Sequence, residues 1–540
     1  RPNWLLGTEI LHLYIRRRSK EMSDPKLRNF HEAKWDEPVI FEQSVPGSRS
    51  ILFPDVSQKA MPVTGDVSDL IPDHLKRQKS PALPEMAQPQ VLRHYLRLSQ
   101  ETIGQDINID IGLGTCTMKY SPKINEQFVR SSKFTEMHPY QDDDTAQGIL
   151  KIIYDFEQIM KEISGLDAVS FQAGGGGQGI YANAAVLKKY FEDKGEADQR
   201  TQIITTILSH PLDSAAPATK GFEVISLYPD ENGYPSLENL KAVVSEKTAG
   251  IFITNPEDTG VFNPIIREFV DVVHEAGGLC VCDMADYNGL FGLVRAKELG
   301  ADMCHFNLHK AFASPHACMG PGCAAQCVSA ELEKYLPRPR VRFDGTRYYT
   351  DYDDESSAGK IRQFQGSLAA VLRAYSWVMS LGVDGLKAVA ETAILNNNYM
   401  MKRVLNEVRG ISMSWAEEAP NRLEQVRYSF ETLLQETGVD AEHVNRHMLD
   451  FGFQRFFPSH HPLIVPEPYT PEPTESYSKA DIDEYVAALK KISDEAYSTP
   501  EVVLTAPHNG PISALENDHI ETVDQLAVTW RSYLKQHGRP

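Results

Sequence analysis

The chain has 540 residues, more than one compact hydrophobic core can use, so two or three domains are expected. Its net charge of −20 at pH 7 argues against a nucleic-acid surface, and no apolar run approaches the roughly 18–20 residues that a membrane span needs. The seven cysteines form no CxxC pair, which argues against a metal site and indicates buried free thiols in a reducing cytoplasm.

Residues 1–90 are predicted to form an N-terminal extension and arm. A helix is expected only over about 4–22, because prolines recur at positions 46, 54, 62, 72, 81, 84 and 89 and interrupt any longer element. A segment with so little core of its own is expected to wrap a partner domain or subunit.

Residues 91–350 are predicted to form a large α/β domain. Isoleucines and other apolar residues recur at helical spacing over 147–164, and further helices are expected over 180–191 and 262–276. Apolar or β-branched runs between them predict strands over 168–171, 201–208, 223–227, 250–254, 278–283 and 303–306. Alternation of this kind predicts a mostly parallel sheet covered on both faces, with ligands bound outside the carboxyl ends of its strands.

Residues 351–540 are predicted to form a helical connection and a smaller C-terminal domain. The stretch 360–410 is expected to be helical, whereas 420–540 mixes helices with short strands and contains the proline-rich turn 466–473. We expect this α+β domain to close over the site of the large domain.

Two successive strand ends carry the residues that a pyridoxal-phosphate (PLP) enzyme needs. Asp283 ends one buried strand, and His309 and Lys310 follow the next, with Asn307 close by. The lysine amine would form the Schiff base with the cofactor aldehyde, and the aspartate would keep the pyridine nitrogen protonated. We therefore predict that Lys310 and Asp283 are catalytic and bind PLP.

A glycine-rich turn supplies the second requirement, a phosphate site. The segment 172–179, QAGGGGQG, joins a predicted strand to a predicted helix. Bare backbone N–H groups and a helix N-terminus favour a dianion, although a glycine run alone is also typical of a flexible turn. Gly175, Gly176, Gly177 and Gln178 are the predicted cofactor-binding residues of this turn.

Two more strand ends point to the same edge of the sheet. His210 could contact the cofactor ring or the substrate, or simply cap its strand. Thr254 and Asn255 could donate hydrogen bonds to the cofactor, or make the turn that Pro256 dictates. With Asn307 and Ala285 they complete the predicted cofactor-binding set, and His309 and His210 complete the predicted catalytic set.

The ordered set of strand-end motifs is the order expected of fold-type I, aspartate aminotransferase-like PLP enzymes. The chain resembles the glycine decarboxylase P-protein of the glycine cleavage system, in particular the catalytic second subunit of its split form. The resemblance runs from about residue 37 to 533 and is carried by LRHYLRLS at 92–99, GTCTMKYSPKINE at 114–126, NLHKAF at 307–312, AILNNNY at 393–399, DFGF at 450–453 and EPTES at 472–476.

The resemblance implies PLP-dependent decarboxylation of glycine, with transfer of the aminomethyl group to the lipoyl arm of a carrier protein. It also implies an oligomer, either a homodimer of this chain or a heterotetramer with a first subunit as partner. The substrate carboxylate would bind an arginine, and Arg362, Arg373 and Arg455 are equally open.

Several departures from the family pattern cluster around the predicted pocket. Gln178 replaces a histidine expected to stack on the pyridine ring, and Asp286 adds a carboxylate near it. Further replacements occur in PLDS at 211–214, HACMGPG at 316–322 and FQR at 453–455. They favour an alternative, a stand-alone PLP decarboxylase, lyase or transferase for another amino acid, whereas the presence of Lys310 argues against a non-catalytic assembly subunit.

Overall fold

The fold is described from a computed structural model. It describes residues 25–49, 51, 61–65, 67–79, 81–104, 106–109, 111–113, 117, 119–315, 322–353, 355–454, 464–512, 529–536 and 538. The predicted helix over 4–22, most of the segment 316–322 and Arg455 lie outside these residues.

The core of the large domain is a seven-stranded sheet in the order β2-β8-β7-β6-β5-β3-β4. Its strands are β2 (Ala168–Ser170), β3 (Gln202–Thr206), β4 (Glu223–Leu227), β5 (Thr248–Thr254), β6 (Leu279–Asp283), β7 (Met303–Asn307) and β8 (Ala324–Val328). Only β8 among them runs antiparallel to its neighbours, β2 and β7. The predicted α/β architecture with a mostly parallel sheet is therefore confirmed.

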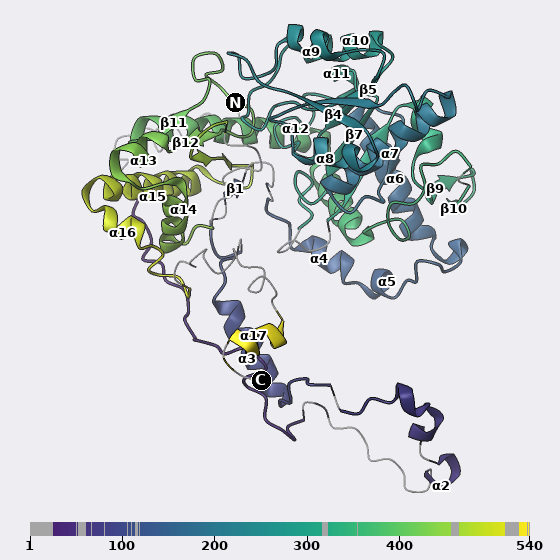
Figure 1. Ribbon diagram of the computed structural model, residues 1–540, viewed down its shortest axis with the longest axis vertical. Helices are drawn as coiled ribbons and strands as arrows, with labels where there is room; N and C mark the ends of the chain where they lie inside the picture. Colours follow the sequence, from purple (N-terminus) through teal and green to yellow (C-terminus); the bar gives the residue numbers. More distant parts are fainter. Residues whose placement is uncertain are drawn as a thin grey trace, which may run out of the picture.

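Both faces of this sheet are covered, because alternate residues of its strands enter two different hydrophobic cores. On β5, Ile251 and Ile253 pack in the core that contains Phe156 of α6, whereas Phe252 packs in the core that contains Leu187 of α7. The helices of the large domain are α6 (Gln147–Ser164), α7 (Gly176–Lys194), α8 (Leu212–Thr219), α9 (Leu237–Val243), α10 (Ile266–Glu275) and α11 (Ala296–Leu299). Figure 1 shows them around the sheet.

The C-terminal region has its own core, in which Met400, Tyr428 and Tyr485 are buried. Its helices are α13 (Glu431–Thr437), α14 (Ala441–Met448), α15 (Lys479–Ser498) and α16 (Pro500–Leu504), beside the antiparallel sheet β11 (Ser412–Met413), β12 (Tyr428–Ser429) and β13 (Pro468–Tyr469). The long helix α12 (Leu368–Glu407), kinked at Gly382, contributes to both cores. A domain boundary at residue 350 stays a prediction.

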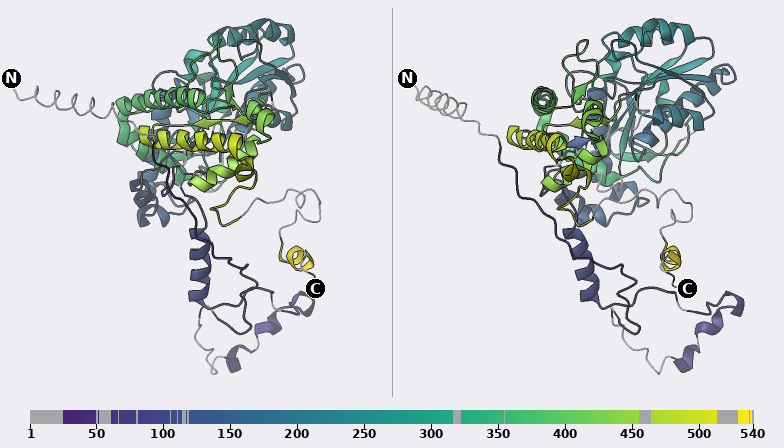
Figure 2. Two further views of the ribbon diagram at one scale, coloured as in Figure 1. Left: turned by 90° about the vertical axis from the view of Figure 1, so that its left-hand side faces the viewer. Right: turned by 60° about the vertical axis from the view of Figure 1, so that its left-hand side comes forward.

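The N-terminal arm projects away from this body, as Figures 1 and 2 show. It contains α2 (Met61–Thr64), the 3-10 helices η1 (Val67–Leu70) and η2 (Asp73–Leu75), and α3 (Gln88–Gln100). The C-terminal helix α17 (Trp530–Gln536) joins it, because Trp530 stacks on Phe41 with ring centroids 4.7 Å apart. The arm is therefore built from both ends of the chain.

The remaining elements are short and connect these regions. They are α4 (Ile124–Val129), α5 (Ser132–Thr135), η3 (Asp143–Thr145), η4 (Ala330–Tyr335), η5 (Leu449–Phe451), the pair β1 (Gly112–Leu113) with β14 (Pro471–Glu472), and the hairpin β9 (Arg340–Phe343) with β10 (Tyr348–Asp351). In the part of the chain that the structure describes, no helix combines the length and the apolar character needed to cross a membrane.

Candidate active site

The glycine-rich turn lies between β2 and the N-terminus of α7, and its glycines are required by close neighbours. A Cβ atom on Gly176 would come within 2.9 Å of Nδ2 of Asn307, and one on Gly174 within 2.2 Å of Nη1 of Arg362. A side chain at either place would displace the end of one of these neighbouring side chains. The turn thus presents bare backbone at the start of a helix of 19 residues, which is a favourable environment for an anion.

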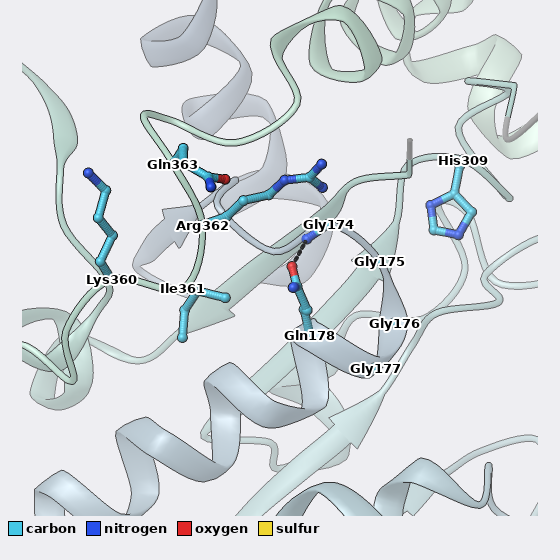
Figure 3. Close-up of a pocket in the computed structure, with 10 residues that line it drawn as sticks. All are labelled: Gly174, Gly175, Gly176, Gly177, Gln178, His309, Lys360, Ile361, Arg362 and Gln363. Atoms are coloured by element: carbon cyan, nitrogen blue, oxygen red, sulfur yellow. Dashed lines mark hydrogen bonds between the residues drawn. The ribbon is translucent and has the colours of Figure 1, made fainter. Parts of the chain in front are cut away.

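Gln178 closes this turn. Its Oε1 accepts a hydrogen bond of 2.7 Å from the backbone N–H of Gly174, and Figure 3 shows the side chain directed back to that glycine. In this arrangement the amide of Gln178 holds the backbone of the turn. Stacking on the pyridine ring would not need this hydrogen bond.

Two cationic side chains line the cavity at the glycine-rich turn. Lys360 and Arg362 line a cavity of about 920 Å³ together with residues 174–178, His309, Ile361 and Gln363. Figure 3 shows Arg362 lying over the turn, with His309 on the far side of the glycines. The geometry separates the three candidate arginines, because Arg373 is paired with Glu126 at 2.7 Å and Arg455 lies outside the described residues.

Asp283 is buried at the carboxyl end of β6 and is oriented by its neighbours. Its Oδ1 accepts a hydrogen bond from the N–H of Ala285 at 2.8 Å and lies 3.1 Å from Nε2 of His305 on the adjacent strand β7. Burial lowers the pKa of His305 and the positive charge of Lys310 acts in the same direction, although Asp283 opposes them. His305 is therefore a neutral ring at neutral pH, so it does not form an ion pair with Asp283.

Lys310 and His309 follow β7 and are both buried. The backbone N–H of Lys310 donates to the carbonyl of Asn307 at 3.1 Å, which fixes a tight turn at the strand end. Nδ1 of His309 lies 3.1 Å from the carbonyl oxygen of Cys323, so the ring is oriented by the backbone of that segment. These contacts hold both side chains at the edge of the sheet where Asp283 ends its strand.

The two remaining strand ends behave differently from each other. The amide of Asn255 is engaged on both sides by the backbone of Asn263, at 2.9 and 3.2 Å, so it makes the turn. Nδ1 of His210 accepts a hydrogen bond of 3.1 Å from the N–H of Leu212, at the start of α8. Oγ1 of Thr254 is buried without a hydrogen-bond partner within the described part of the chain.

A continuous set of contacts links the glycine-rich turn to the strand ends. Asn307 lies against Gly176, and the ring of His305 lies within 2.7 Å of where a Cβ on Gly179 would be and 3.1 Å from Asp283. Sequence reasoning missed His305, whose only signal was a polar ring inside the apolar strand 303–306. It also assigned no role to Lys360, which no motif marks.

The site fits a small polar ligand such as PLP. Oγ1 of Thr254, Oδ1 of Asn307 and both carboxyl oxygens of Asp213 are buried without hydrogen-bond partners among the described residues. Buried polar atoms normally have partners, so those that lie at this edge are groups that a bound molecule would satisfy. The glycine-rich turn and the acid at the end of β6 are of the kinds that would hold the phosphate and the pyridine nitrogen.

Sheet order, glycine-rich turn and the strand-end Asp and Lys together define the fold of fold-type I PLP enzymes. The fold is similar to a crystal structure of glycine decarboxylase (P-protein) of the glycine cleavage system, with a TM-score of 0.67 over 82% of this chain and 99% of that chain at 17% identity. It is also similar to a sphingosine-1-phosphate lyase from Burkholderia pseudomallei, with a TM-score of 0.58, 15% identity and coverage of 79% and 95%.

Sequence comparison places the chain more closely. Residues 63–342 match the family described as glycine cleavage system P-protein, and residues 389–510 match the glycine dehydrogenase C-terminal domain. A probable glycine dehydrogenase (decarboxylating) subunit 2 from Pyrococcus abyssi is 41% identical, over 94% of this chain and 99% of the relative. The protein of that name from Caldanaerobacter subterraneus is 36% identical, over 91% and 98%. The chain belongs to the P-protein family.

Proposed function

We propose that this chain is the PLP-binding, glycine-decarboxylating second subunit of a split glycine dehydrogenase. The observation that carries the proposal is the full-length match to proteins of that name, combined with a strand-end site whose Asp283 and Lys310 are intact. The fold alone would not select glycine, because one fold hosts many functions.

The proposed roles follow from the placement of the residues. Lys310 provides the amine that attaches the cofactor aldehyde, and Asp283 holds the proton on the pyridine nitrogen. Gly175, Gly176, Gly177 and Gln178 form the phosphate site with Arg362 above them, and Lys360 lines the same cavity. When bound, PLP supplies a ring that stabilises negative charge on the carbon from which carbon dioxide leaves.

The other predicted residues surround the ring and the substrate. Thr254 and Asn307 offer unpaired polar atoms to the cofactor, and Ala285 follows Asp283 where a small side chain leaves room. His309 and His210 are proposed to face the substrate, His309 from the wall of the cavity. Asn255 is proposed to act through the turn that it holds.

A lipoyl carrier is the proposed acceptor. An apolar cavity of about 340 Å³ is lined by Phe134, Met137, Ile153 and the segment 364–369. That segment directly follows Gln363, which lines the polar cavity at the glycine-rich turn. A long apolar arm with a reactive end is a ligand that would use both cavities.

A first subunit is the proposed partner of the arm. Leu92, Tyr95 and Leu96 lie at i, i+3 and i+4 spacing on α3 and are 60%, 57% and 53% exposed. An apolar helical stripe without cover is typical of a protein interface. The five described cysteines are buried and free, which supports a reducing compartment, the cytoplasm.

The test is the exchange of labelled bicarbonate into the carboxyl carbon of glycine by the PLP-loaded protein, with and without a lipoylated carrier. We expect exchange that Lys310→Ala abolishes and that Lys402→Ala, a change of an exposed lysine on α12, leaves intact. Absence of exchange, together with a cofactor spectrum that shifts with a different amino acid, would overturn glycine as the substrate.

A further inference from the structure

Asp213 is a buried acid at the cofactor edge that the proposed mechanism does not use. It lies in the first turn of α8, which packs against β3, β5 and α7, and it is 1% exposed. Neither carboxyl oxygen makes a hydrogen bond of normal geometry among the residues described, although the Thr254 hydroxyl lies close enough to influence its pKa, so the acid does not cap its own helix. The neighbouring Leu212 packs against Gly177, which places α8 beside the glycine-rich turn.

The titratable side chains that face Asp213 are acids. Asp283 approaches it from β6, and Glu257 and Asp258 from the segment after β5. Arg427, a nearby cation, lies 3.1 Å from Asp258, and the neutral ring of His305 lies beside Asp283. Glu257 instead accepts a hydrogen bond from Thr206 at 2.9 Å. A carboxylate at position 213 would therefore face other acidic side chains.

Burial is the largest influence on this acid and raises the pKa of Asp213 well above its ordinary range, and Asp283 and Glu257 raise it further. The Thr254 hydroxyl acts in the opposite direction and is outweighed. Burial also raises the pKa of Glu257, to about 8. Burial and neighbouring acids both disfavour the ionised form of a carboxyl group, so they favour the protonated form of Asp213.

We propose that Asp213 donates a hydrogen bond from the O–H of its carboxyl group to the bound cofactor. It is a positioning residue, and the proposal rests on the proposed PLP site. A neutral acid in an apolar pocket is a strong donor to a developing or resident negative charge. Of Asp213 and Asp283, only Asp283 is then left to face a protonated ring nitrogen.

The first test is infrared difference spectroscopy of the PLP-loaded protein at pH 7. We expect the carbonyl stretch of a protonated carboxyl group that is absent from Asp213→Asn, while Glu257→Gln removes a separate band. If Asp213→Asn instead removes the stretch of a carboxylate, the acid is ionised and the proposal is overturned.

The second test is the dissociation constant of PLP, measured by titration over a range of pH for the wild-type protein, Asp213→Asn and Asp213→Ala. Asp213→Asn keeps an N–H donor, so we expect wild-type affinity at pH 7, whereas Asp213→Ala weakens binding about tenfold. At high pH the wild-type protein loses affinity relative to Asp213→Asn, because only the acid can ionise. Thermal unfolding of each variant identifies any general loss of structure.

The two tests separate this inference from the proposed function. Equal affinity of Asp213→Ala and the wild-type protein, or tighter binding by Asp213→Asn at pH 7, overturns the role of Asp213. Loss of glycine exchange with these affinities as expected overturns the substrate and leaves the acid in place. A wild-type protein that binds no PLP overturns both.

Discussion

The carboxyl edge of the central sheet and the N-terminal arm differ in which side chains lack contacts, polar ones at the sheet edge and apolar ones on the arm. At the sheet edge the apolar residues are covered, and polar atoms such as Oγ1 of Thr254 and Oδ1 of Asn307 are buried without partners among the described residues. On the arm the acid Glu37 is paired, with His94 at 2.9 Å and Arg97 at 3.1 Å. There it is the apolar side chains of α3 that lack cover.

The difference shows what kind of partner each region needs. Buried polar atoms without partners cost free energy until a small polar molecule supplies them, whereas an exposed apolar stripe is stabilised by another protein surface. The paired acid of the arm keeps α3 and residues 35–47 in one shape before any partner binds. The sheet edge is therefore read as a cofactor site and the arm as a subunit interface.

The largest expected effect is on the arm. Replacing Leu92 and Leu96 by aspartate removes two apolar side chains worth about 1.5–3 kcal/mol each when buried, so we expect association to weaken more than a hundredfold. Sedimentation of the chain alone and mixed with its companion subunit measures this. Val383→Asp, at an exposed apolar residue of α12, is the matched control, and an unchanged assembly of the double variant would remove α3 from the interface.

Arg362→Ala tests the cofactor site at the sheet edge. A hydrogen bond to a charged group contributes about 1.5–3 kcal/mol, so the loss of this guanidinium should weaken PLP binding about 10- to 100-fold. Arg373→Ala is the control, because that arginine is paired with Glu126 away from the glycine-rich turn. Fluorescence titration with PLP measures both, and equal losses in the two variants would argue against a phosphate site beneath Arg362.

Gly174→Ala tests the same phosphate site by adding a single methyl group. The new Cβ would meet Nη1 of Arg362 at 2.2 Å and Oε1 of Gln178 at 2.9 Å, so both side chains must move. We expect about a tenfold loss of PLP affinity, close to the value of one or two hydrogen bonds. Gly104→Ala, which meets no atom within 4 Å, should bind PLP normally. An unaffected Gly174→Ala protein would show that the turn tolerates a side chain.

The smallest effect concerns the pH dependence of the arm. Hydrogen bonding by His94 is the main reason that the pKa of Glu37 is lowered from 4.5 to about 2. Because the folded pKa is depressed, the carboxylate stabilises the arm above about pH 4.5, and this contribution is lost as the pH falls toward 2. Hydrogen exchange of α3 amides should show severalfold lower protection between these values, and Glu37→Gln should show low protection at pH 7 without that step. Identical profiles for both proteins would contradict the role of Glu37.

Sequence patterns predicted the elements because those patterns are local. The helix over 147–164 and the strand over 223–227 match α6 and β4, since a helical period and a β-branched run each bury one face whatever the neighbours are. The strand order could be inferred only as mostly parallel. The split of Ile251 and Phe252 between two cores depends on which helices pack on each face.

Some features of the site could likewise be predicted from the sequence, and others could not. Asp283, Lys310 and the glycines of 174–177 are visible in the sequence, because a reactive residue at a strand end and a run of glycines are both departures from an apolar pattern. The engagement of Asn255 by Asn263 could not be read there, and neither could the choice of Arg362 over Arg373. Each depends on what lies opposite the side chain in space.

The sequence by itself determined the alternation of elements, the family and the residues that stand at strand ends, because these depend on local period and composition. Only the tertiary structure decided which of those residues meet. It placed His305 beside Asp283, Arg362 over the glycine-rich turn and Asp213 among other acids. Burial and charge at a point in the fold are sums over segments far apart in the chain, and no local pattern contains them.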